Sequence, residues 1–252
     1  MSPIERRLRS RGLSFPLKVD TGKDDVCDRS DRKKIFSEDY FADKDVLQVH
    51  LLAALDDIIE RRGFRDILEV GCGTGKLLNA LKREGRRVFG CDISDAAARK
   101  AGASVADAMR LPYKKKSFDL VIAVSVVEHL TEEEGNMLLD EAFRLLKKGG
   151  CFFMVTPNLS SPMRHIKGSR WFGYSDKTHI TFYTPKSLAK KMERFGFLDI
   201  QSMFSLRSYP DFNWGIPFKT PAALNRFFSW LFIATPLALV RDSFWIMGKC
   251  SK

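Results

Sequence analysis

A short apolar run that ends in a glycine-rich loop constrains the fold of this chain more than any other feature. Residues 67–70 are apolar apart from Glu69, and Gly71, Gly73 and Gly75 follow at every second position. An apolar run that closes on such a loop predicts a buried parallel strand turning into a helix. Glycine is needed where a ligand approaches the backbone closely and where φ is positive. We therefore expect the loop to hold a nucleoside-like ligand, with a tight turn as the simpler alternative.

Strand and helix patterns alternate along the rest of the chain. The run at 118–124 is almost unbroken, as expected for a strand buried on both faces. The strands are predicted at residues 67–70, 87–91, 103–106, 118–124, 151–156, 197–206 and 243–249. This alternation specifies a parallel α/β sheet with right-handed crossovers, whose ligands bind at the carboxyl ends of the strands.

One helix has clear signals at both ends. Thr131 and Glu134 have the spacing of a capping box at its start. Residues 147–150, Lys-Lys-Gly-Gly, match the charge and glycine preferences of a helix C-terminus. We therefore expect the helix to end within residues 147–150 and the fifth strand to begin directly after them.

The glycine loop differs from the dinucleotide fingerprint G-x-G-x-x-G/A. Its third glycine comes one residue early, and Lys76 stands where that fingerprint has its last glycine or alanine. An acid followed by G-x-G-x-G resembles the first motif of the class I S-adenosylmethionine-dependent methyltransferases. The resemblance implies that the loop lies against the methionine part of S-adenosylmethionine, with the acid near its amino group. The cofactor residues implied in this stretch are Glu69, Gly71, Cys72, Gly73 and Gly75.

Acids follow the next two predicted strands. Asp92, with Ile93 beside it, ends the second strand, where a carboxylate can accept both hydroxyls of a ribose. An N-cap for the following helix is the alternative role for Asp92. The string around Asp107 and Ala108 is similar to the segment that contacts adenine in the same family, where the acid accepts from the amino group and the next backbone faces the ring. A turn aspartate is the alternative for Asp107.

Two histidines are candidate catalytic residues. Residues 125–130 resemble a segment of the small-molecule branch of these enzymes, in which the first residue, Ser125, lines the methionine and Glu128 with His129 lies beside the reaction cavity. The pKa of a free histidine lies near neutrality, so His129 can accept a proton from a substrate hydroxyl, or it can fix the loop by a hydrogen bond. His179 lies in a similar "H…FTP"-like segment and is the second candidate base, with helix capping or packing as the alternative.

The first 34 residues and one insertion differ in composition from the alternating strands and helices. Residues 1–34 are charged and aperiodic, and we expect a flexible basic arm there, followed by a methyltransferase domain over 35–252. Within it, 207–242 is an insertion whose apolar run, residues 227–240, is shorter than the roughly 20 residues of a membrane span and is interrupted by Pro236. Residues 212–240 are hypothesised to contact a membrane surface or a lipid-like substrate, and a helix packed on the domain's own core is the alternative.

Charge and cysteine content limit the partners and cofactors. The net charge of +11 fits an anionic partner or simply a solvated basic surface. The five cysteines form no C-x-x-C pair, which indicates reduced thiols in a cytoplasmic protein. The spacing of histidines and acids suggests no ligand set, and methyl transfer from a sulfonium requires no metal, so none is expected.

The resemblance covers most of the chain. It implies a Rossmann-like sheet of seven strands, mostly parallel, with helices on both faces and an antiparallel last strand. It also implies methyl transfer from S-adenosylmethionine to a small acceptor, with oxygen as the expected acceptor atom and nucleic acid not expected. The alternatives are an NAD-linked oxidoreductase and a non-catalytic adapter of the same fold that binds membrane or RNA.

Overall fold

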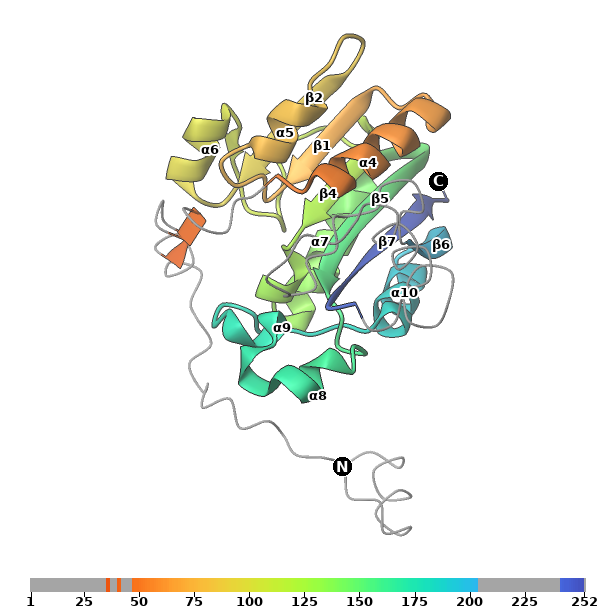
Figure 1. Cartoon of the computed structure of the whole chain (residues 1–252). Coiled ribbons are helices and arrows are strands. Elements are labelled where there is room, and N and C mark those ends of the chain that lie inside the picture. Colours follow the sequence, from red (N-terminus) through yellow and green to blue (C-terminus); the bar gives the residue numbers. More distant parts are fainter. Residues whose placement is uncertain (1–34, 37–39, 42–46, 204–240, 252) are drawn as a thin grey trace, which may run out of the picture.

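A single twisted sheet organises the chain (Figure 1). The computed structural model describes residues 35–36, 40–41, 47–203 and 241–251, so the predicted arm at 1–34 and the stretch 212–240 lie outside it. Within the described part the seven strands have the order β3-β2-β1-β4-β5-β7-β6. Their bounds are β1 Asp66–Val70, β2 Arg87–Asp92, β3 Ser104–Val105, β4 Phe118–Val124, β5 Leu146–Pro157, β6 Phe197–Met203 and β7 Ser243–Cys250.

The direction of the strands confirms the predicted fold class. Strands β1 to β5 pair in parallel, and β7 lies antiparallel between β5 and β6. The predicted strand positions agree with the structure within a few residues, except that β3 is only two residues long and β5 begins earlier than expected. Both residues of the central pair Ile67 and Leu68 are fully buried, so β1 is covered on both faces as a parallel strand requires.

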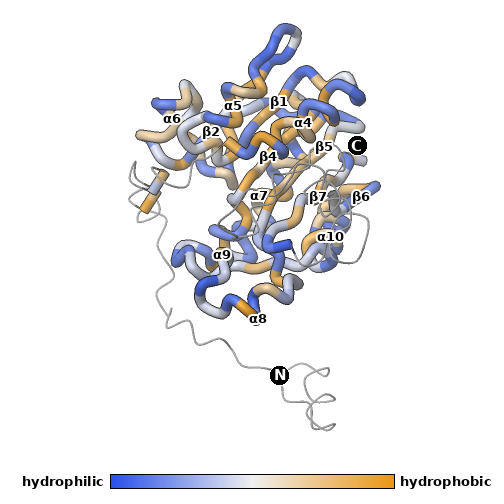
Figure 2. Tube along the Cα trace, viewed as in Figure 1, coloured by the Kyte–Doolittle hydropathy of each residue, from blue (hydrophilic) through white to orange (hydrophobic). Residues whose placement is uncertain are grey.

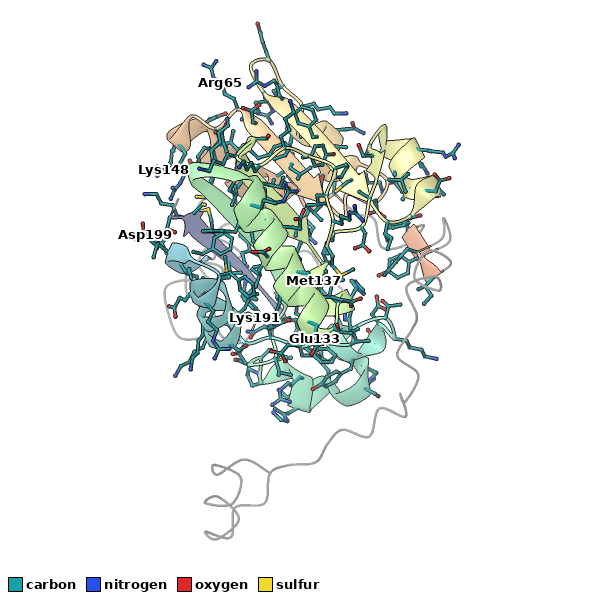
Figure 3. All side chains as sticks on the ribbon, turned by 180° about the vertical axis from the view of Figure 1, so that it is seen from behind. Arg65, Glu133, Met137, Lys148, Lys191 and Asp199 are labelled. Atoms are coloured by element: carbon teal, nitrogen blue, oxygen red, sulfur yellow. The ribbon has the colours of Figure 1, made fainter. Side chains whose placement is uncertain are left out.

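Helices cover the two faces of the sheet. One face packs against α4 (Val49–Arg62), α5 (Lys76–Leu81) and α6 (Asp95–Ala101). The other face packs against α7 (Glu132–Leu145) and α10 (Pro185–Arg194), and Figure 3 shows α7 lying across it. Apolar residues follow the central strands, whereas the loop between α5 and β2 is hydrophilic (Figure 2).

The start of β5 corrects one prediction. Helix α7 ends at Leu145, so residues 147–150 belong to the strand and not to the end of the helix. The pairing of β5 with β4 shifts register here. Gly149 has a φ of 78°, and a Cβ on Gly150 would lie 2.9 Å from the carbonyl oxygen of Asp119. The two glycines therefore serve an irregularity in the sheet, because their backbone geometry is needed there and not at a helix end.

Short elements between β5 and α10 form a cap over the carboxyl end of the sheet. They are α8 (Met163–Lys167), the 3₁₀ turn η2 (Gly168–Arg170) and α9 (Phe172–Ser175). Trp171 is fully buried, and its indole N–H donates to Asp242 Oδ1 at 2.9 Å. Lys167 also pairs with Asp242, so the residue that leads into β7 anchors this cap.

The predicted helix cap and the predicted buried thiols are both present in the structure. Thr131 and Glu134 form the predicted capping box. Cys72, Cys91, Cys151 and Cys250 are buried free thiols. Among the described helices, none is both long and apolar enough to cross a bilayer.

Candidate active site

The glycine loop after β1 is fastened to the end of β2. The backbone N–H groups of Gly71 and Cys72 both donate to the carbonyl oxygen of Cys91, at 2.8 and 3.0 Å. The N–H of Gly73 donates to Asp92 Oδ2 at 2.9 Å. The loop is therefore held in a fixed shape by backbone and carboxylate bonds, with its backbone turned toward the space above the sheet.

Two glycines of the loop have different roles. Gly71 has a φ of 69°, and a Cβ on it would lie 2.5 Å from Val126 Cγ2. Gly75 has a φ of 86°, and a Cβ on it would lie 2.7 Å from the Cβ of Ala101 in α6. Gly71 thus keeps a cavity wall open, whereas Gly75 allows α5 and α6 to pack closely.

Asp92 is not the N-cap of the following helix. The cap of α6 is Ser94, whose hydroxyl accepts from the N–H of Ala97 at 3.4 Å. Asp92 instead accepts from the N–H of Ser94 at 2.8 Å with Oδ1 and from the glycine loop with Oδ2. Its carboxylate is buried and joins the glycine loop to the end of β2.

Two cavities meet above the carboxyl ends of β1, β2 and β4. The smaller, of about 100 Å³, lies over β2 and the turn after β3. The larger, of about 420 Å³, runs from the glycine loop to the cap formed by α9 and the loop after it. Both are lined by Tyr40, Phe41, Gly71, Ser125 and His129, so these residues mark the junction.

Most of the predicted cofactor residues line these cavities. The smaller cavity is lined by Gly71, Asp92, Ile93, Asp107, Ala108 and Ser125. The larger is lined by Glu69, Gly71, Cys72, Gly73 and Ser125. Gly75 lines neither, which agrees with its packing role. The predicted adenine and ribose contacts therefore face one cavity, and the predicted methionine contacts face the other.

The chemistry of the walls fits S-adenosylmethionine. Glu69, the residue before the last of β1, is 4% exposed and lines the larger cavity, where a carboxylate suits a cationic amino group. Asp92 and Asp107 offer acceptors at the smaller cavity for hydroxyl and amino hydrogens. A side chain at Gly71 would obstruct the wall that both cavities share. These residues would hold the nucleoside and amino acid ends of the cofactor.

Ser125 has an unusual backbone at the end of β4. Its φ is 52°, and its N–H donates to the carbonyl oxygen of Val155 at 2.9 Å. A residue other than glycine in this region costs roughly 1–3 kcal/mol, and such residues concentrate at functional sites. The strained turn directs the following 3₁₀ helix η1 (Val127–His129) toward the cavity junction.

A hydrogen-bond network fixes the orientation of His129. Thr178 Oγ1 donates to Asp176 Oδ1 at 2.6 Å and lies 2.9 Å from His129 Nδ1. Because the single hydroxyl proton of Thr178 goes to the carboxylate, Nδ1 of His129 must carry the hydrogen that the hydroxyl oxygen accepts. Tyr40 donates to Asp176 Oδ2 at 3.2 Å, and burial raises the pKa of Tyr40, so its hydroxyl stays protonated.

His179 packs against His129 in the wall of the larger cavity. The two ring centroids are 4.7 Å apart. His179 Nδ1 lies 2.9 Å from the carbonyl oxygen of Gly173, and its Nε2 lies 3.8 Å from Asp176 Oδ2. His179 therefore has a packing role and also faces the cavity, so both of its proposed roles have a structural basis.

Glu128 lies beneath the two histidines. It is fully buried, and burial raises its pKa to about 7. Its Oε2 accepts from Thr156 Oγ1 at 3.0 Å. The sequence placed Glu128 beside the cavity only by resemblance, and its burial follows from tertiary packing.

Several residues of the site have no clear signal in the sequence. Asp176, Thr178 and Tyr40 were not singled out, although the network joins them to His129. The ring of Phe36 lies 5.4 Å from that of His129, so the segment 35–41 also reaches the site. The aromatic content of residues 35–41 was the available signal, whereas nothing local distinguishes Thr178.

The parallel sheet, the fixed glycine loop and the acids at successive strand ends define an α/β enzyme fold that binds a nucleoside cofactor. A family model described as a methyltransferase domain matches residues 40–202. The chain belongs to this family, and S-adenosylmethionine is its cofactor. Membership decides against the NAD-linked oxidoreductase.

Relatives of known name agree with this assignment. The chain is 38% identical over 90 residues to a tRNA (carboxymethyluridine(34)-5-O)-methyltransferase of Xenopus tropicalis, covering 33% of this chain and 14% of that protein. It is 30% identical over 147 residues to a ubiquinone biosynthesis O-methyltransferase of Nitrobacter winogradskyi, covering 52% and 55%. The chain thus spans about half or less of the length of these curated relatives.

Solved structures share the fold. A SAM-dependent methyltransferase from Archaeoglobus fulgidus superposes with a TM-score of 0.55 at 22% identity, covering 79% of this chain and 94% of that one. This likeness concerns the architecture alone. The acceptor must be inferred from the site.

Proposed function

We propose that the protein transfers the methyl group of S-adenosylmethionine to a hydroxyl oxygen of a small, aromatic or lipid-like acceptor. The observation that carries this proposal is the position of His129, which lines both cavities and stands at their junction. The two curated relatives named above are O-methyltransferases, which supports oxygen as the acceptor atom.

The residues of this chain would align the reactants. S-adenosylmethionine supplies a methyl group on a sulfonium, whose S–C bond breaks as the O–C bond forms and whose sulfur keeps the electron pair. The glycine loop and Asp92 fix the donor, so the protein's main contribution is orientation. His129 and His179 flank the acceptor end of the larger cavity and would promote loss of the hydroxyl proton.

One part of the wall of the larger cavity is apolar and suits an apolar part of an acceptor. Tyr40, Phe41 and Phe172 line it together with Leu47 and Leu51. Such a surface matches a ring or an alkyl chain better than a folded nucleic acid, whose phosphates would seek a basic groove. Membrane contact through residues 212–240 is part of the same proposal, because it would bring a lipid-like acceptor to the cavity.

The test uses methyl-labelled cofactor with separate lipid, polar-metabolite and RNA fractions of cell extract. We expect label in an ether or ester of a small molecule, found by mass spectrometry, and loss of that product in His129→Gln. His165→Gln, at an exposed position, is the control and should leave the product unchanged. Label only in RNA would refute the small acceptor, and failure to bind S-adenosylhomocysteine would favour a non-catalytic adapter.

The membrane contact has its own test. Deletion of residues 212–240 is expected to lower co-sedimentation with anionic liposomes. Negligible binding by the intact protein would rule the contact out.

A further inference from the structure

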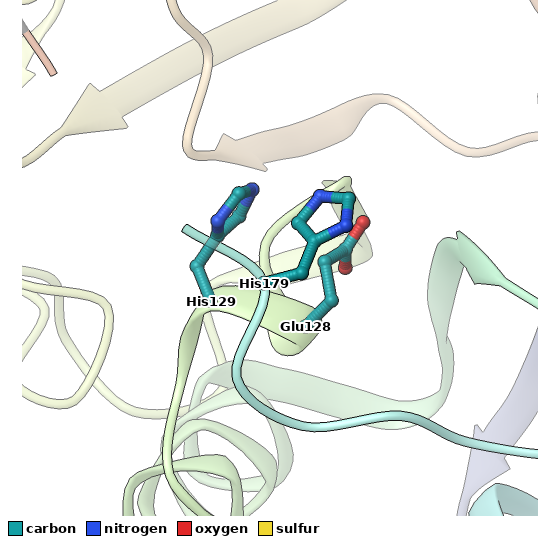
Figure 4. A group of neighbouring side chains, drawn as sticks. All are labelled: Glu128, His129 and His179. Atoms are coloured by element: carbon teal, nitrogen blue, oxygen red, sulfur yellow. The ribbon is translucent and has the colours of Figure 1, made fainter. Parts of the chain in front are cut away.

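Three side chains with metal-ligating atoms converge at the end of β4. They are Glu128 and His129 of η1 and His179 from the loop before α10, drawn together in Figure 4. One carboxylate oxygen and one nitrogen from each ring all lie within 4.8 Å of one another. This cluster could not be recognised in the sequence, because His179 lies 50 residues after the adjacent pair Glu128 and His129.

The carboxylate of Glu128 is incompletely satisfied. The residue is fully buried, and Thr156 occupies Oε2. Oε1 is also buried and lacks a partner in hydrogen-bond geometry among the residues that the structure describes, while the Ser125 side chain and the backbone of Glu128 act on the same carboxyl group and lower its pKa. Buried carboxylate oxygens are normally paired, because an unpaired one loses its hydration without compensation. A cation beside Glu128 would supply the missing interaction.

Both imidazoles are oriented in the way that metal-binding histidines are. His179 Nδ1 lies against the carbonyl oxygen of Gly173, which can only accept, so Nδ1 carries the hydrogen. His129 Nδ1 donates to Thr178, whose own hydroxyl proton goes to Asp176. Metal-ligating histidines use this arrangement, in which a carbonyl or carboxylate partner on one nitrogen makes the other nitrogen the ligand.

We propose that Glu128, His129 and His179 bind a divalent transition-metal ion such as Zn²⁺ at the acceptor end of the larger cavity. Two imidazoles and a carboxylate form a common ligand set with positions left for substrate. Ligand atoms around tetrahedral zinc lie about 3.4 Å apart, so the side chains would close by about 1 Å on binding. Asp176 Oδ2, 3.8 Å from His179 Nε2, adds a second negative charge nearby.

The role of the metal ion in the reaction rests on the proposed function. A cation there would bind the acceptor oxygen and favour loss of its proton to water, which is how the histidine pair would promote methyl transfer. The histidines then act as ligands and not as direct proton acceptors. Metal binding itself can be measured without any acceptor.

The experiment is calorimetric titration of tag-free, chelator-treated protein with Zn²⁺. We expect one strong Zn²⁺ site per chain. Loss of a group that supports a metal ligand costs roughly 10- to 100-fold in metal affinity, and the ligand variants Glu128→Gln and His179→Gln should lose more than that. Thr178→Val, which removes only such a support, should fall within that 10- to 100-fold range. The control His165→Gln removes an exposed histidine and should bind like the wild type.

Several outcomes would overturn the metal site. These are the absence of binding by the wild type, wild-type affinity in both ligand variants, or an equal loss in His165→Gln. Circular dichroism of the metal-free variants verifies that they fold, and Glu128→Gln keeps the shape of the buried side chain. Binding of S-adenosylhomocysteine is measured in parallel: intact cofactor binding without zinc binding refutes the metal alone, whereas lost cofactor binding counts against the proposed function.

Discussion

The proposed cofactor side and the proposed acceptor side of the candidate active site are built in different ways. On the cofactor side, Gly71, Gly73 and Asp92 follow directly from strands and are joined by bonds between neighbouring strand ends. On the acceptor side, His129 is oriented by residues from the irregular chain between β5 and α10. That chain is in turn anchored through Trp171 to Asp242.

The two sides therefore differ in what fixes their geometry: residues close in sequence on one side, and contacts between distant segments on the other. The cofactor loop needs glycines with positive φ and an acid one strand away, which a short sequence can specify. The acceptor side needs side chains from distant segments to meet, so its geometry depends on the whole cap. Perturbing one side should therefore leave the other largely intact, whereas a change in the sheet that carries both should act on the fold as a whole.

The largest effect is expected at Gly71. Alanine at this position combines a strained φ of 69° with a Cβ 2.5 Å from Val126 Cγ2. We expect binding of S-adenosylhomocysteine to weaken by about 100-fold or more, measured by calorimetry. Gly63→Ala is the matched control, because Gly63 has a φ of 65° with no atom within 4 Å of the added Cβ. Equal losses in the two variants would show that strain alone, and not the cavity wall, matters.

The second prediction is that Gly173→Ala perturbs the acceptor side by displacing a buried ring. A Cβ there would lie 2.1 Å from the ring of the buried Trp171. We expect Gly173→Ala to destabilise the fold by about 2 kcal/mol in urea unfolding and to alter tryptophan fluorescence. Cofactor affinity should stay within about a factor of two, as for independent sites. Ser169→Ala, at an exposed position of the same cap, serves as the control, and a large loss of cofactor affinity in Gly173→Ala would contradict independence.

The third prediction concerns Asp66→Asn, at the start of β1. This substitution should lower the stability of the whole fold, because Asp66 lies in the sheet that carries both sides of the site. Hydrogen bonds from Arg87 and Lys147 lower the pKa of Asp66 to about 2. A depressed pKa stabilises the fold above the ordinary value near 4, and this stability is lost as the pH falls toward 2. We expect roughly 2 kcal/mol from this source.

The measurement is urea unfolding at pH 6 and pH 3. In Asp66→Asn the difference between the two pH values should shrink. Asp95→Asn is the control, because Asp95 makes an exposed ion pair with Arg99 that contributes little. An undiminished pH effect in Asp66→Asn would reject this assignment.

The smallest effect concerns the tautomer of His129. In the wild type we expect only the form with hydrogen on Nδ1, observed by nitrogen-15 NMR of the imidazole. Thr178→Val removes a hydrogen bond of about 1 kcal/mol. The carbonyl oxygen of Thr178 remains 3.2 Å away, so a partial shift to the other tautomer is expected. Thr178→Ser keeps the hydroxyl and should behave like the wild type, and an unchanged spectrum in Thr178→Val would refute the role of the network.

The glycine loop and Asp92 could be singled out from the sequence because their signals are local. The order of strands, the glycine loop and Asp92 all follow from residue types at fixed spacing, and the structure brings them to adjoining cavities. The end of α7 was predicted wrongly for a physical reason. Lys-Lys-Gly-Gly suits a helix end and a sheet irregularity equally, and only pairing with β4 decides between them.

The acceptor side could be predicted only in part. His129 and His179 were candidates, but their contact with each other depends on how the cap folds. Asp176 and Thr178 are ordinary polar residues. They matter for His129 because the Thr178 hydroxyl donates to Asp176 and so accepts from the ring of His129. No pattern in a single sequence encodes such a long-range meeting of side chains.

The placement of β7 between β5 and β6 has a consequence for how this protein could change over evolution. Met203 of β6 pairs with Trp245 of β7, so the chain leaves and re-enters the sheet at neighbouring positions. Lengthening a connection whose ends are already together costs only about 0.6 kcal/mol for each doubling. The segment that joins β6 to β7 can therefore be exchanged for segments of other lengths and compositions while the paired ends of the two strands stay as they are.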